Sequence, residues 1–316
     1  MTDAAILAAL FGGNLDCGAL AQQLGVSVAE IESRLQLLRQ LGYQIEMQPH
    51  RGYTLTEAPD ILIADEIQAR LPGHRFARQL MVYRETRSTN DLVFKAANDG
   101  AAEGFCVLAE SQTHGKGRKG RVWQSAQNKG LWFSLLLRPD WPLAHAAHLT
   151  YLASVALCRA IKKSTKLNCQ IKWPNDVLIG NRKVAGILTE IHGSGSRLDF
   201  AVLGIGCNIL HDARDFSPEL RDKVSSLKMS GANHDLRRAD LLVPLLAELE
   251  MLYSRPWPEI YEQWKTLCLT IGKPVEVQTE HGIVSGQMVG LEENGHLLLR
   301  LPSGKIEIIH SGDVLW

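Results

Sequence analysis

The chain has 316 residues, and its 34 lysines and arginines balance its 34 aspartates and glutamates. With no net charge, no global electrostatic field draws the protein to nucleic acid or to a membrane surface. The N-terminus lacks the basic segment of a signal peptide, no apolar run is long enough for a membrane span, and the six cysteines include no Cys-x-x-Cys pair. We therefore expect a protein of the reducing cytoplasm, with neither a disulfide framework nor a metal site.

The first 56 residues read as three short helices followed by a hairpin, which is the pattern of a winged helix-turn-helix. We expect a helix over 4–10 with Asp3 as its N-cap and a second over 17–24 with Asp16 as its N-cap. The third helix begins after Ser27, where the sequence predicts an S-x-x-E capping box.

Modules of this kind usually bind DNA, yet the charge of this one does not favour it. The module holds three cations against five acids, whereas a DNA-binding surface is normally basic. A structural or regulatory role is therefore the alternative, and the pattern favours DNA binding. The side chains expected to meet DNA are Ser33, Gln36 and Arg39 on the third helix and Arg51 in the wing.

The central region mixes strands with helices. A helix is expected over 149–161, where apolar residues keep helical spacing. Tight turns separate the later strands, which indicates an antiparallel meander and an α+β domain rather than a doubly wound parallel sheet. The strand-like runs are 104–110, 131–137, 169–173, 184–191 and 198–205.

The last part of the chain contains two more helical segments and then a run of short strands. Helices are expected over 241–252, with Asp240 as the cap and Pro244 near the first turn, and over 259–268. Beyond them, short apolar runs alternate with Asn-Gly and Ser-Gly pairs, which are strong hairpin signals and predict a small closed β-barrel. The predicted domains are residues 1–60, 61–268 and 269–316, with a linker at 57–60.

The stretch G-K-G-R-K-G-R-V-W concentrates four cations, Lys116, Arg118, Lys119 and Arg121, among interleaved glycines. Glycine lets the backbone approach a ligand, and backbone N–H groups with Arg and Lys side chains hold phosphate. The alternative is a solvated basic loop or a patch for RNA. Trp123, which ends the stretch, can stack on a ligand ring or belong to the core.

Two polar segments precede and border this basic loop. Ser88, Thr89 and Asn90 supply hydroxyls and an amide, which suit a neutral polar ligand group such as a urea. They serve equally well as the N-cap of a helix over 91–98, which is the reading that the segment alone favours. Gln112 lies at the mouth of the basic loop, where an exposed loop residue is the alternative.

Further candidates lie near the ends of later strands. Lys172, Asn175 and Asp176 lie in K-W-P-N-D, which is either a turn or part of a phosphate or ribose site. Lys183 precedes Gly186 in a strand, where a glycine suggests close approach of a ligand or another backbone. A lysine placed there can pair with a carboxylate or a phosphoryl oxygen.

The ordered set of these motifs resembles that of the bacterial biotin–protein ligases. In chain order, the motifs are S-T-N, Gln112, the basic loop, K-W-P-N-D, R-K-V-A-G-I-L at 182–188 and G-I-G-C-N at 204–208. The resemblance is specifically to the bifunctional ligase/repressor type and covers essentially the whole chain. The family's loop usually reads G-R-G-R-R-G-R, so that Lys116 and Lys119 replace arginines and lose bidentate geometry while keeping charge.

This resemblance implies a class II synthetase-like catalytic domain and an SH3-like C-terminal barrel. It also implies that biotin reacts with ATP and Mg²⁺ to give biotinyl-AMP, from which biotin passes to a lysine of the biotin carboxyl carrier protein of acetyl-CoA carboxylase. A second role as biotin operon repressor, acting as a homodimer on operator DNA, would follow. The alternatives are a repressor that senses biotinyl-AMP with weak ligase activity, and a related lipoate or octanoate ligase.

The resemblance assigns roles to individual residues, with Lys183 and Arg118 as the catalytic pair. The expected biotin site comprises Ser88, Thr89, Asn90, Gln112, Lys116, Gly117, Arg118, Lys183 and Gly186. The expected ATP site comprises Lys119, Arg121, Trp123, Lys172, Asn175, Asp176 and Asn208.

Overall fold

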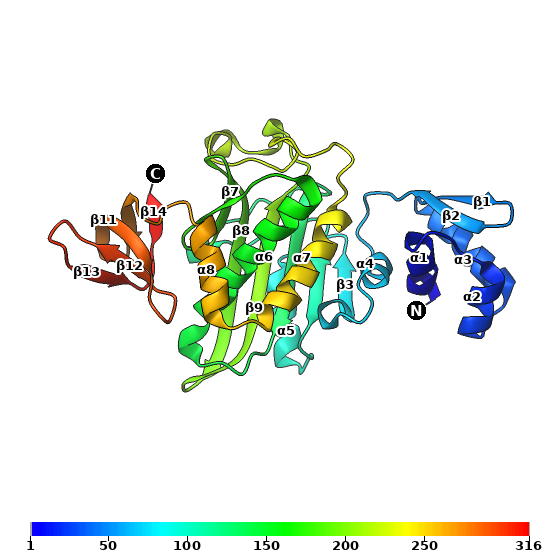
Figure 1. Cartoon of the computed structure of the whole chain (residues 1–316), viewed down its shortest axis with the longest axis horizontal. Coiled ribbons are helices and arrows are strands. Elements are labelled where there is room, and N and C mark those ends of the chain that lie inside the picture. Colours follow the sequence, from blue (N-terminus) through cyan, green and yellow to red (C-terminus); the bar gives the residue numbers. More distant parts are fainter. Residues whose placement is uncertain (1, 316) are drawn as a thin grey trace.

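Three lobes follow one another along the long axis of the molecule in a computed structural model that describes residues 2–315 (Figure 1). The winged lobe, from α1 to β2, lies at one end, and the C-terminal lobe, from β10 to β14, lies at the other. The central lobe between them carries the largest sheet and the longest helix. No helix within residues 2–315 combines the length and the apolar character needed to cross a membrane.

The winged lobe has the predicted order of elements and its own buried core. Asp16 caps the second helix as predicted, because its carboxylate accepts the amides of Gly18 and Ala19 at 2.8 and 3.0 Å. Ser27 Oγ accepts the Glu30 amide at 3.2 Å, but within residues 2–315 the Glu30 side chain returns no hydrogen bond to the Ser27 amide, so only half of the predicted capping box forms. The elements are α1 (Thr2–Phe11), α2 (Cys17–Leu24), α3 (Val28–Gln40), β1 (Gln44–Gln48) and β2 (Gly52–Glu57).

Two predicted helix caps are wrong. The first helix begins at Thr2, which places Asp3 inside its first turn, 3.7 Å from Arg34. The seventh helix begins at Arg238, so that Asp240 also lies in a first turn rather than at the N-cap. Both carboxylates still favour the helix, because they lie at the positive end of its dipole.

The central sheet has seven strands in the order β3-β4-β5-β9-β8-β7-β6. Neighbours are antiparallel, as predicted, except that β3 and β4 run parallel and are connected through α5. The strands are β3 (Gln79–Tyr83), β4 (Phe105–Ala109), β5 (Gly130–Leu137), β6 (Gln170–Lys172), β7 (Asp176–Ile179), β8 (Arg182–Ser194) and β9 (Arg197–Asn208).

Helices cover both faces of this sheet, because alternate side chains of each strand point to opposite sides. Val107 and Leu136 pack with Val93 of α5 in one cluster, whereas Leu108 and Leu135 belong to the larger core with α6 and α7. In Figure 1 the helices α6, α7 and α8 lie in front of the strands. The helices are α4 (Ala64–Arg70), α5 (Thr89–Asn98), α6 (Ala147–Thr165), α7 (Arg238–Tyr253) and α8 (Trp257–Leu267).

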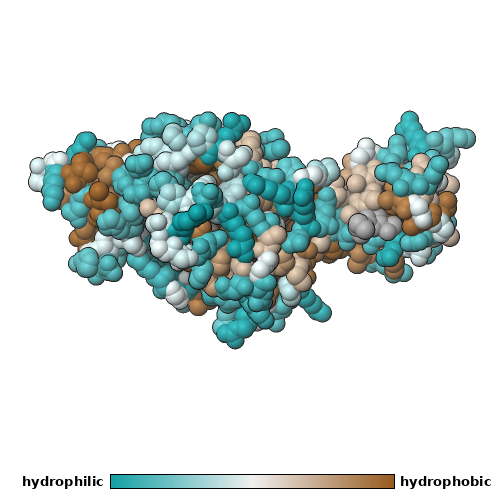
Figure 2. Space-filling model, turned by 90° about the horizontal axis from the view of Figure 1, so that it is seen from below, coloured by the Kyte–Doolittle hydropathy of each residue, from teal (hydrophilic) through white to brown (hydrophobic). Residues whose placement is uncertain are grey.

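The C-terminal lobe is a five-stranded antiparallel sheet in the order β13-β12-β11-β10-β14. The last strand was not predicted, because three residues are too few to show an alternating pattern. Closure of the sheet into a barrel stays a prediction. Figure 2 shows hydrophobic side chains gathered on this lobe. The strands are β10 (Pro274–Thr279), β11 (Gly282–Leu291), β12 (Leu297–Arg300), β13 (Ile306–Ile309) and β14 (Asp313–Leu315).

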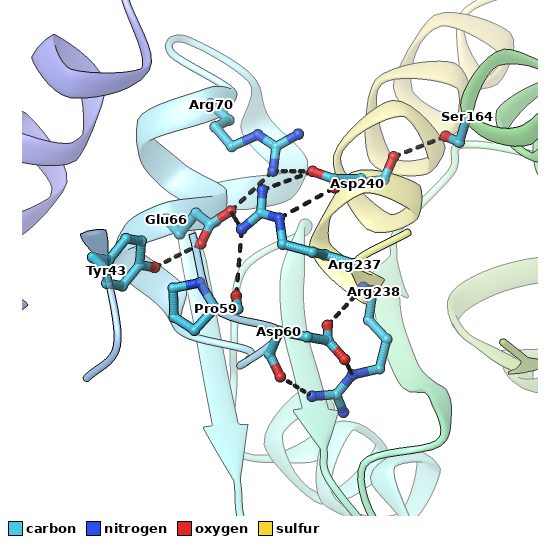
Figure 3. A network of polar contacts seen from close by, with 9 residues as sticks. All are labelled: Tyr43, Pro59, Asp60, Glu66, Arg70, Ser164, Arg237, Arg238 and Asp240. Carbon is cyan, nitrogen blue, oxygen red and sulfur yellow. Dashed lines mark hydrogen bonds and ion pairs between the residues drawn. The ribbon is translucent and has the colours of Figure 1, made fainter. Parts of the chain in front are cut away.

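A network of charged side chains on the central lobe meets the winged lobe at Tyr43 (Figure 3). The hydroxyl of Tyr43 donates to the fully buried Glu66 at 2.6 Å, and Glu66 also accepts from Arg70 and Arg237 at 2.9 and 3.0 Å. The predicted linker is held as well, because Asp60 accepts from Arg238 Nε at 3.0 Å.

Candidate functional site

A cavity of about 1020 Å³ lies where the central sheet meets the basic loop and the C-terminal lobe. Its floor includes glycines of β8 and β9 on the sheet face that carries α5. Its walls come from the start of α5, the basic loop, the segment between β6 and β7, and β14. Segments more than 200 residues apart in the sequence therefore surround one space, because Ser88 and Asp313 both line it.

The structure brings the predicted ligand-site residues together with one exception. Every residue assigned above to biotin or ATP lines the cavity except Lys119. Lys119 has a left-handed backbone (φ 54°) in the short helical turn η2 (Arg118–Gly120), and its Nζ lies 3.5 Å from Asp313. The basic loop is therefore a wall of this cavity, although one of its cations does not line it.

The polar segment at the start of α5 forms a buried hydrogen-bond network. Gln112 Oε1 accepts the Thr89 amide at 2.8 Å, and Ser134 Oγ donates to Asn90 Oδ1 at 2.5 Å. Asn90 Nδ2 donates to Glu190 at 2.7 Å. Ser88 occupies the N-cap position of α5, but its side chain makes no capping hydrogen bond. The segment thus starts a helix, as predicted, and also lines the cavity with buried polar groups.

Two glycines in the floor of the cavity make room for the ring of Trp123. Gly186 and Gly206 face each other across β8 and β9, and the ring of Trp123 lies on both. A Cβ added to Gly206 would lie 2.6 Å from the ring, and one added to Gly186 would lie 2.9 Å from it. Any larger residue would therefore displace the indole. Lys183 Nζ also lies 5.0 Å from the ring centroid, within range of a cation–π interaction.

Carboxylates of the chain itself face most of the cations of the site. Lys183 Nζ lies 2.7 Å from Asp176, and Lys116 pairs with Asp91. Arg118 Nη1 lies 3.1 Å from Asp313. The hydrogen bond to Asp91 raises the pKa of Lys116 above its usual value, so this lysine stays charged. The site therefore holds cations that are paired with carboxylates of the chain, and an anionic ligand can replace these carboxylates as the partner.

Asp313 is the carboxylate around which the basic loop gathers. Its oxygens contact Arg118, Lys119 and Arg121. Burial alone would raise the pKa of the Asp313 carboxyl, but Arg118, Arg121 and Lys119 together hold it below its usual value. Burial lowers the pKa of Arg118 despite the attraction of Asp313. The C-terminal lobe thus contributes an ionised acid to the wall of the site.

The predicted asparagines of the site are bound to the backbone. Asn175 Nδ2 donates to the carbonyl of Ile187 at 2.7 Å, and Asn208 Nδ2 donates to the carbonyl of Ser225 at 3.1 Å. Lys172 lies nearby with a pKa that burial lowers. Each asparagine therefore fixes two segments of the cavity wall relative to each other.

Sequence reasoning missed several polar side chains of the site and its surroundings, among them Asp91, Ser134, Glu190 and Asp313. Asp91 directly follows the S-T-N segment, and its position was a usable signal. Ser134 lies inside an apolar strand, where a lone serine gives no signal of its partners. Asp313 lies far along the chain from the basic loop, and no local pattern connects the two.

The residues expected to meet DNA lie on the exposed side of the winged lobe. Ser33 and Gln36 are exposed on α3, and Arg51 is exposed between β1 and β2. Arg39 is also exposed, but its guanidinium donates to the carbonyl of Ile45 at 3.1 and 2.7 Å. Arg39 therefore helps to hold β1 against α3, whatever else it contacts.

Family models match all three parts of the chain. The model of the biotin/lipoate A/B protein ligase family matches residues 82–208, and that of the biotin protein ligase C terminal domain matches residues 270–315. A model of a helix-turn-helix domain matches residues 5–54.

Individual relatives match along nearly the whole length. The bifunctional ligase/repressor BirA of Bacillus subtilis (strain 168) is 34% identical, over 93% of this chain and 91% of the relative. BirA of Escherichia coli (strain K12) is 29% identical over the same shares. The solved structure of the biotin protein ligase from Aquifex aeolicus with biotin and ATP is 28% identical, with a TM-score of 0.64, and covers 75% of this chain and 98% of that one.

Proposed function

Because the chain belongs to the family of bifunctional biotin–protein ligases and repressors, we propose that its central cavity forms biotinyl-AMP and transfers biotin to a protein lysine. The enzyme is an ATP-dependent biotin ligase. The observation that carries the site assignment is the convergence of the S-T-N segment, the basic loop and Lys183 on one cavity.

In the first step, a carboxylate oxygen of biotin attacks the α-phosphorus of ATP. The bond between the α-phosphorus and the bridging oxygen breaks, and pyrophosphate leaves. Two anions have to meet, so fixed cations are needed where the charge accumulates. Lys183 and Arg118 supply that charge, with Lys116 and Gly117 beside them, once the ligand oxygens replace Asp176 and Asp313 at these cations.

Biotin lies at the α5 end of the cavity in this proposal. The hydroxyls and amides of Ser88, Thr89, Asn90 and Gln112 hold its urea group, which offers both N–H donors and a carbonyl acceptor. The aliphatic chain then runs toward Lys183, along the part of the cavity where the ring of Trp123 lies on Gly186.

ATP lies at the opposite end, against the basic loop and the K-W-P-N-D segment. Arg121 and Lys172 face the phosphates there, and Trp123 lies over the floor of the cavity. Lys119 attracts the phosphates from outside the wall, while Asn175 and Asn208 hold the surrounding segments. Closure of the basic loop over the adenylate excludes water, which would hydrolyse it.

Magnesium enters with ATP in this proposal. No group of three or more His, Cys, Asp or Glu side chains within residues 2–315 is arranged to hold a metal ion. Mg²⁺ commonly binds through substrate phosphates and one or two carboxylates, and Asp176 is the carboxylate next to Lys183 that lines the cavity. The ion then neutralises phosphate charge during adenylation.

Biotin-dependent exchange between ATP and pyrophosphate tests the site. Lys183→Ala removes a fixed cation at the reacting centre, and we expect a loss of roughly 10²- to 10³-fold in exchange rate. Lys163→Ala is the matched control, because Lys163 is exposed on the last turn of α6 and lies outside the cavity lining. Equal effects of the two substitutions would refute the site assignment.

In the second step, the amine of an acceptor lysine attacks the acyl carbon of biotinyl-AMP, and AMP leaves. We propose the biotin carboxyl carrier protein of acetyl-CoA carboxylase as the acceptor. A relative from Paracoccus denitrificans, 33% identical over 73% of this chain, is named a biotin–[acetyl-CoA-carboxylase] ligase. Mass spectrometry of the carrier protein before and after incubation tests this transfer, and an unchanged mass would refute it.

A second role as biotin operon repressor rests on the helix-turn-helix match over residues 5–54 and on the BirA relatives. We propose that α3 and the wing contact operator DNA through Ser33, Gln36, Arg39 and Arg51. Gln36→Ala and Arg51→Ala in the intact protein should weaken salt-dependent retention of biotin operon DNA and leave pyrophosphate exchange unchanged. DNA retention that neither substitution alters would argue against this surface.

The repressor form is proposed to be a homodimer that pairs through the edges of the central sheets. The strands β3 and β6 are the edge strands of that sheet. Sedimentation equilibrium with and without biotinyl-AMP tests the assembly, and a monomer at every concentration would refute it. Lipoate remains the alternative substrate, and competition between biotin and lipoate in the exchange assay distinguishes the two.

A further inference from the structure

Tyr151 is a buried residue to which the proposed reaction assigns no contact with biotin or ATP, and its hydroxyl connects the cavity wall to the C-terminal lobe. It lies on α6 with 3% of its surface exposed. Its hydroxyl donates to the carbonyl of Gly295 at 2.6 Å and accepts from Trp173 Nε1 at 3.0 Å. Gly295 belongs to the turn between β11 and β12 of the C-terminal lobe, whereas Trp173 belongs to the cavity wall.

The turn of the C-terminal lobe fits closely against α6 at this point. A Cβ added to Gly295 would lie 2.8 Å from the ring of Tyr151, and φ at Gly295 is +88°, which favours glycine. His148 Nε2 lies 2.8 Å from the carbonyl of Glu293 in the same turn. These contacts fix the lobe on α6 through neutral groups and backbone carbonyls.

On its other side, the hydroxyl holds Trp173 against the end of the C-terminal lobe. Trp173 is 2% exposed, and its ring would lie 3.6 Å from a Cβ added to Gly312. The carbonyl of Gly312 accepts from Arg118 at 3.2 Å, and the next residue, Asp313, pairs with the same guanidinium. Tyr151 is therefore connected to Arg118 by three successive contacts, through Trp173 and Gly312.

Trp173 also precedes the segment that faces the proposed nucleotide end. Three residues further on, Asp176 pairs with Lys183 at 2.7 Å. By contrast, the polar groups at the α5 end are held by Gln112, Ser134 and Glu190, none of which hydrogen-bonds to Tyr151 in the described part of the chain. A change at the hydroxyl of Tyr151 should therefore affect one end of the cavity more than the other.

We propose that Tyr151 is a positioning residue for adenylation, and this inference rests on the proposed function. Its hydroxyl fixes Trp173 and the C-terminal lobe together, so that Asp176 and Asp313 hold Lys183 and Arg118 where the phosphates of ATP arrive. Loss of the hydroxyl leaves the Gly295 carbonyl and the Trp173 N–H without their partner, and the two segments can then shift relative to each other.

Tyr151→Phe in the full-length protein tests this role by steady-state pyrophosphate exchange, with ATP and biotin varied separately. We expect KM for ATP to rise about tenfold, equivalent to one lost hydrogen bond, while KM for biotin changes less than about twofold. A KM for ATP that stays unchanged, or an equal rise in both KM values, overturns the inference, even if the protein unfolds at a lower temperature.

A second substitution keeps the inference testable if Tyr151→Phe fails to fold. Trp173→Phe removes the indole N–H, keeps a ring in place and leaves the bond from Tyr151 to Gly295 intact. We expect the same selective rise in KM for ATP from Trp173→Phe alone. Where Tyr151→Phe also folds, the two effects should not add in a double-mutant cycle. Additive effects, or an unchanged KM for ATP in Trp173→Phe, overturn the coupling.

Tyr261→Phe is the matched control. The hydroxyl of Tyr261 accepts the amide of Leu291 in the C-terminal lobe at 3.2 Å, but it does not contact Trp173 in residues 2–315. It should leave KM for ATP unchanged, and a tenfold rise here would overturn the specific role of Tyr151. Absence of biotin-dependent exchange in the unsubstituted protein would instead refute the proposed function.

Discussion

The two ends of the central lobe are joined to their neighbours by different chemistry. At the junction with the winged lobe, Tyr43 bonds to a network of charges on the central lobe, in which Glu66, Arg70, Arg237 and Asp240 pair across α4 and the start of α7 (Figure 3). The junction with the C-terminal lobe on α6 consists instead of rings, a hydroxyl and backbone carbonyls. There, His148 contacts the carbonyl of Glu293 and stacks on Trp257 of the central lobe, with ring centroids 3.7 Å apart.

The hydrophobic cores follow the same division. Buried residues of the C-terminal lobe, such as Val277 and Leu297, belong to the same cluster as Tyr151 and Trp264 of the central lobe. The winged lobe has its own cluster around Ile31 and Leu35, against which only partly buried residues of the central lobe, such as Ile63 and Ala69, pack in the described part of the chain. A shared core resists separation because apolar area would be exposed, whereas a charge network depends on each partner being present. We therefore expect the winged lobe to be the separable one.

The largest effect should come from Arg238, which is fully buried and pairs with Asp60 and Glu110. Arg238→Met keeps most of the side-chain volume but leaves two carboxylates without their partner. We expect a loss of about 3–5 kcal/mol in the free energy of unfolding. Urea denaturation measures it. A loss below about 1 kcal/mol would mean that this junction does not depend on its charges.

Tyr43→Phe tests the one hydrogen bond that the winged lobe gives to the buried Glu66. Hydrogen bonds to charged groups contribute about 1.5–3 kcal/mol, so this loss should be smaller than that of Arg238→Met. Because the winged core is separate, calorimetry should show an early transition for the winged lobe alone. Pyrophosphate exchange should stay unchanged. A single transition that shifts as a whole would contradict the separability of this lobe.

The pH dependence of stability tests the junction with the C-terminal lobe through His148. Burial lowers the pKa of His148 to about 4, with the hydrogen bond to the Glu293 carbonyl and the charge of Glu292 opposing this shift and His145 adding to it. In the unfolded chain, His148 has the ordinary histidine pKa of 6.5, so below pH 6.5 the unfolded chain binds more protons than the folded one. The free energy of unfolding therefore falls as the pH drops from about 6.5 toward 4.

Between pH 7.5 and pH 5.5, protonation of His148 should lower the free energy of unfolding by about 1 kcal/mol. His211 carries a similar shift inside the central lobe and adds its own pH dependence. His148→Gln should therefore reduce the slope of stability against pH without abolishing it, as measured by urea denaturation across this range. An unchanged slope would show that His148 is not held neutral at this junction.

The sequence predicted which residues come together around one cavity, with the exception of Lys119, but it did not predict the junctions between lobes. The candidate residues come in short motifs at strand ends and in one glycine-rich loop, and the resemblance to a known family grouped these motifs into one site. The partners of Arg238 lie 128 and 178 residues away, and the glycine contacted by Tyr151 lies 144 residues away. Such pairings depend on how helices pack, which no local pattern records.

The errors in the fold have equally local causes. Asp3 and Asp240 have the residue type of an N-cap, yet each helix begins before them because their backbone continues the helix. The parallel pair β3–β4 was missed because the first strand, Gln79–Tyr83, lies among irregular segments. Trp173 was seen only as part of a motif, since the sequence gives no sign that its N–H bonds to Tyr151.

The smallest effect should come from Arg255, which pairs with Glu259 at 3.7 Å on the surface of the central lobe. Both side chains are about half exposed, at 53% and 52%, so water already solvates each charge when the other is removed. Arg255→Ala should therefore change the free energy of unfolding by less than about 0.5 kcal/mol in the same urea titration. It removes one arginine, as Arg238→Met does, and differs from it in burial. If the two substitutions cost the same, then burial does not set the strength of the charged junction, and the contrast between the two ends of the molecule fails.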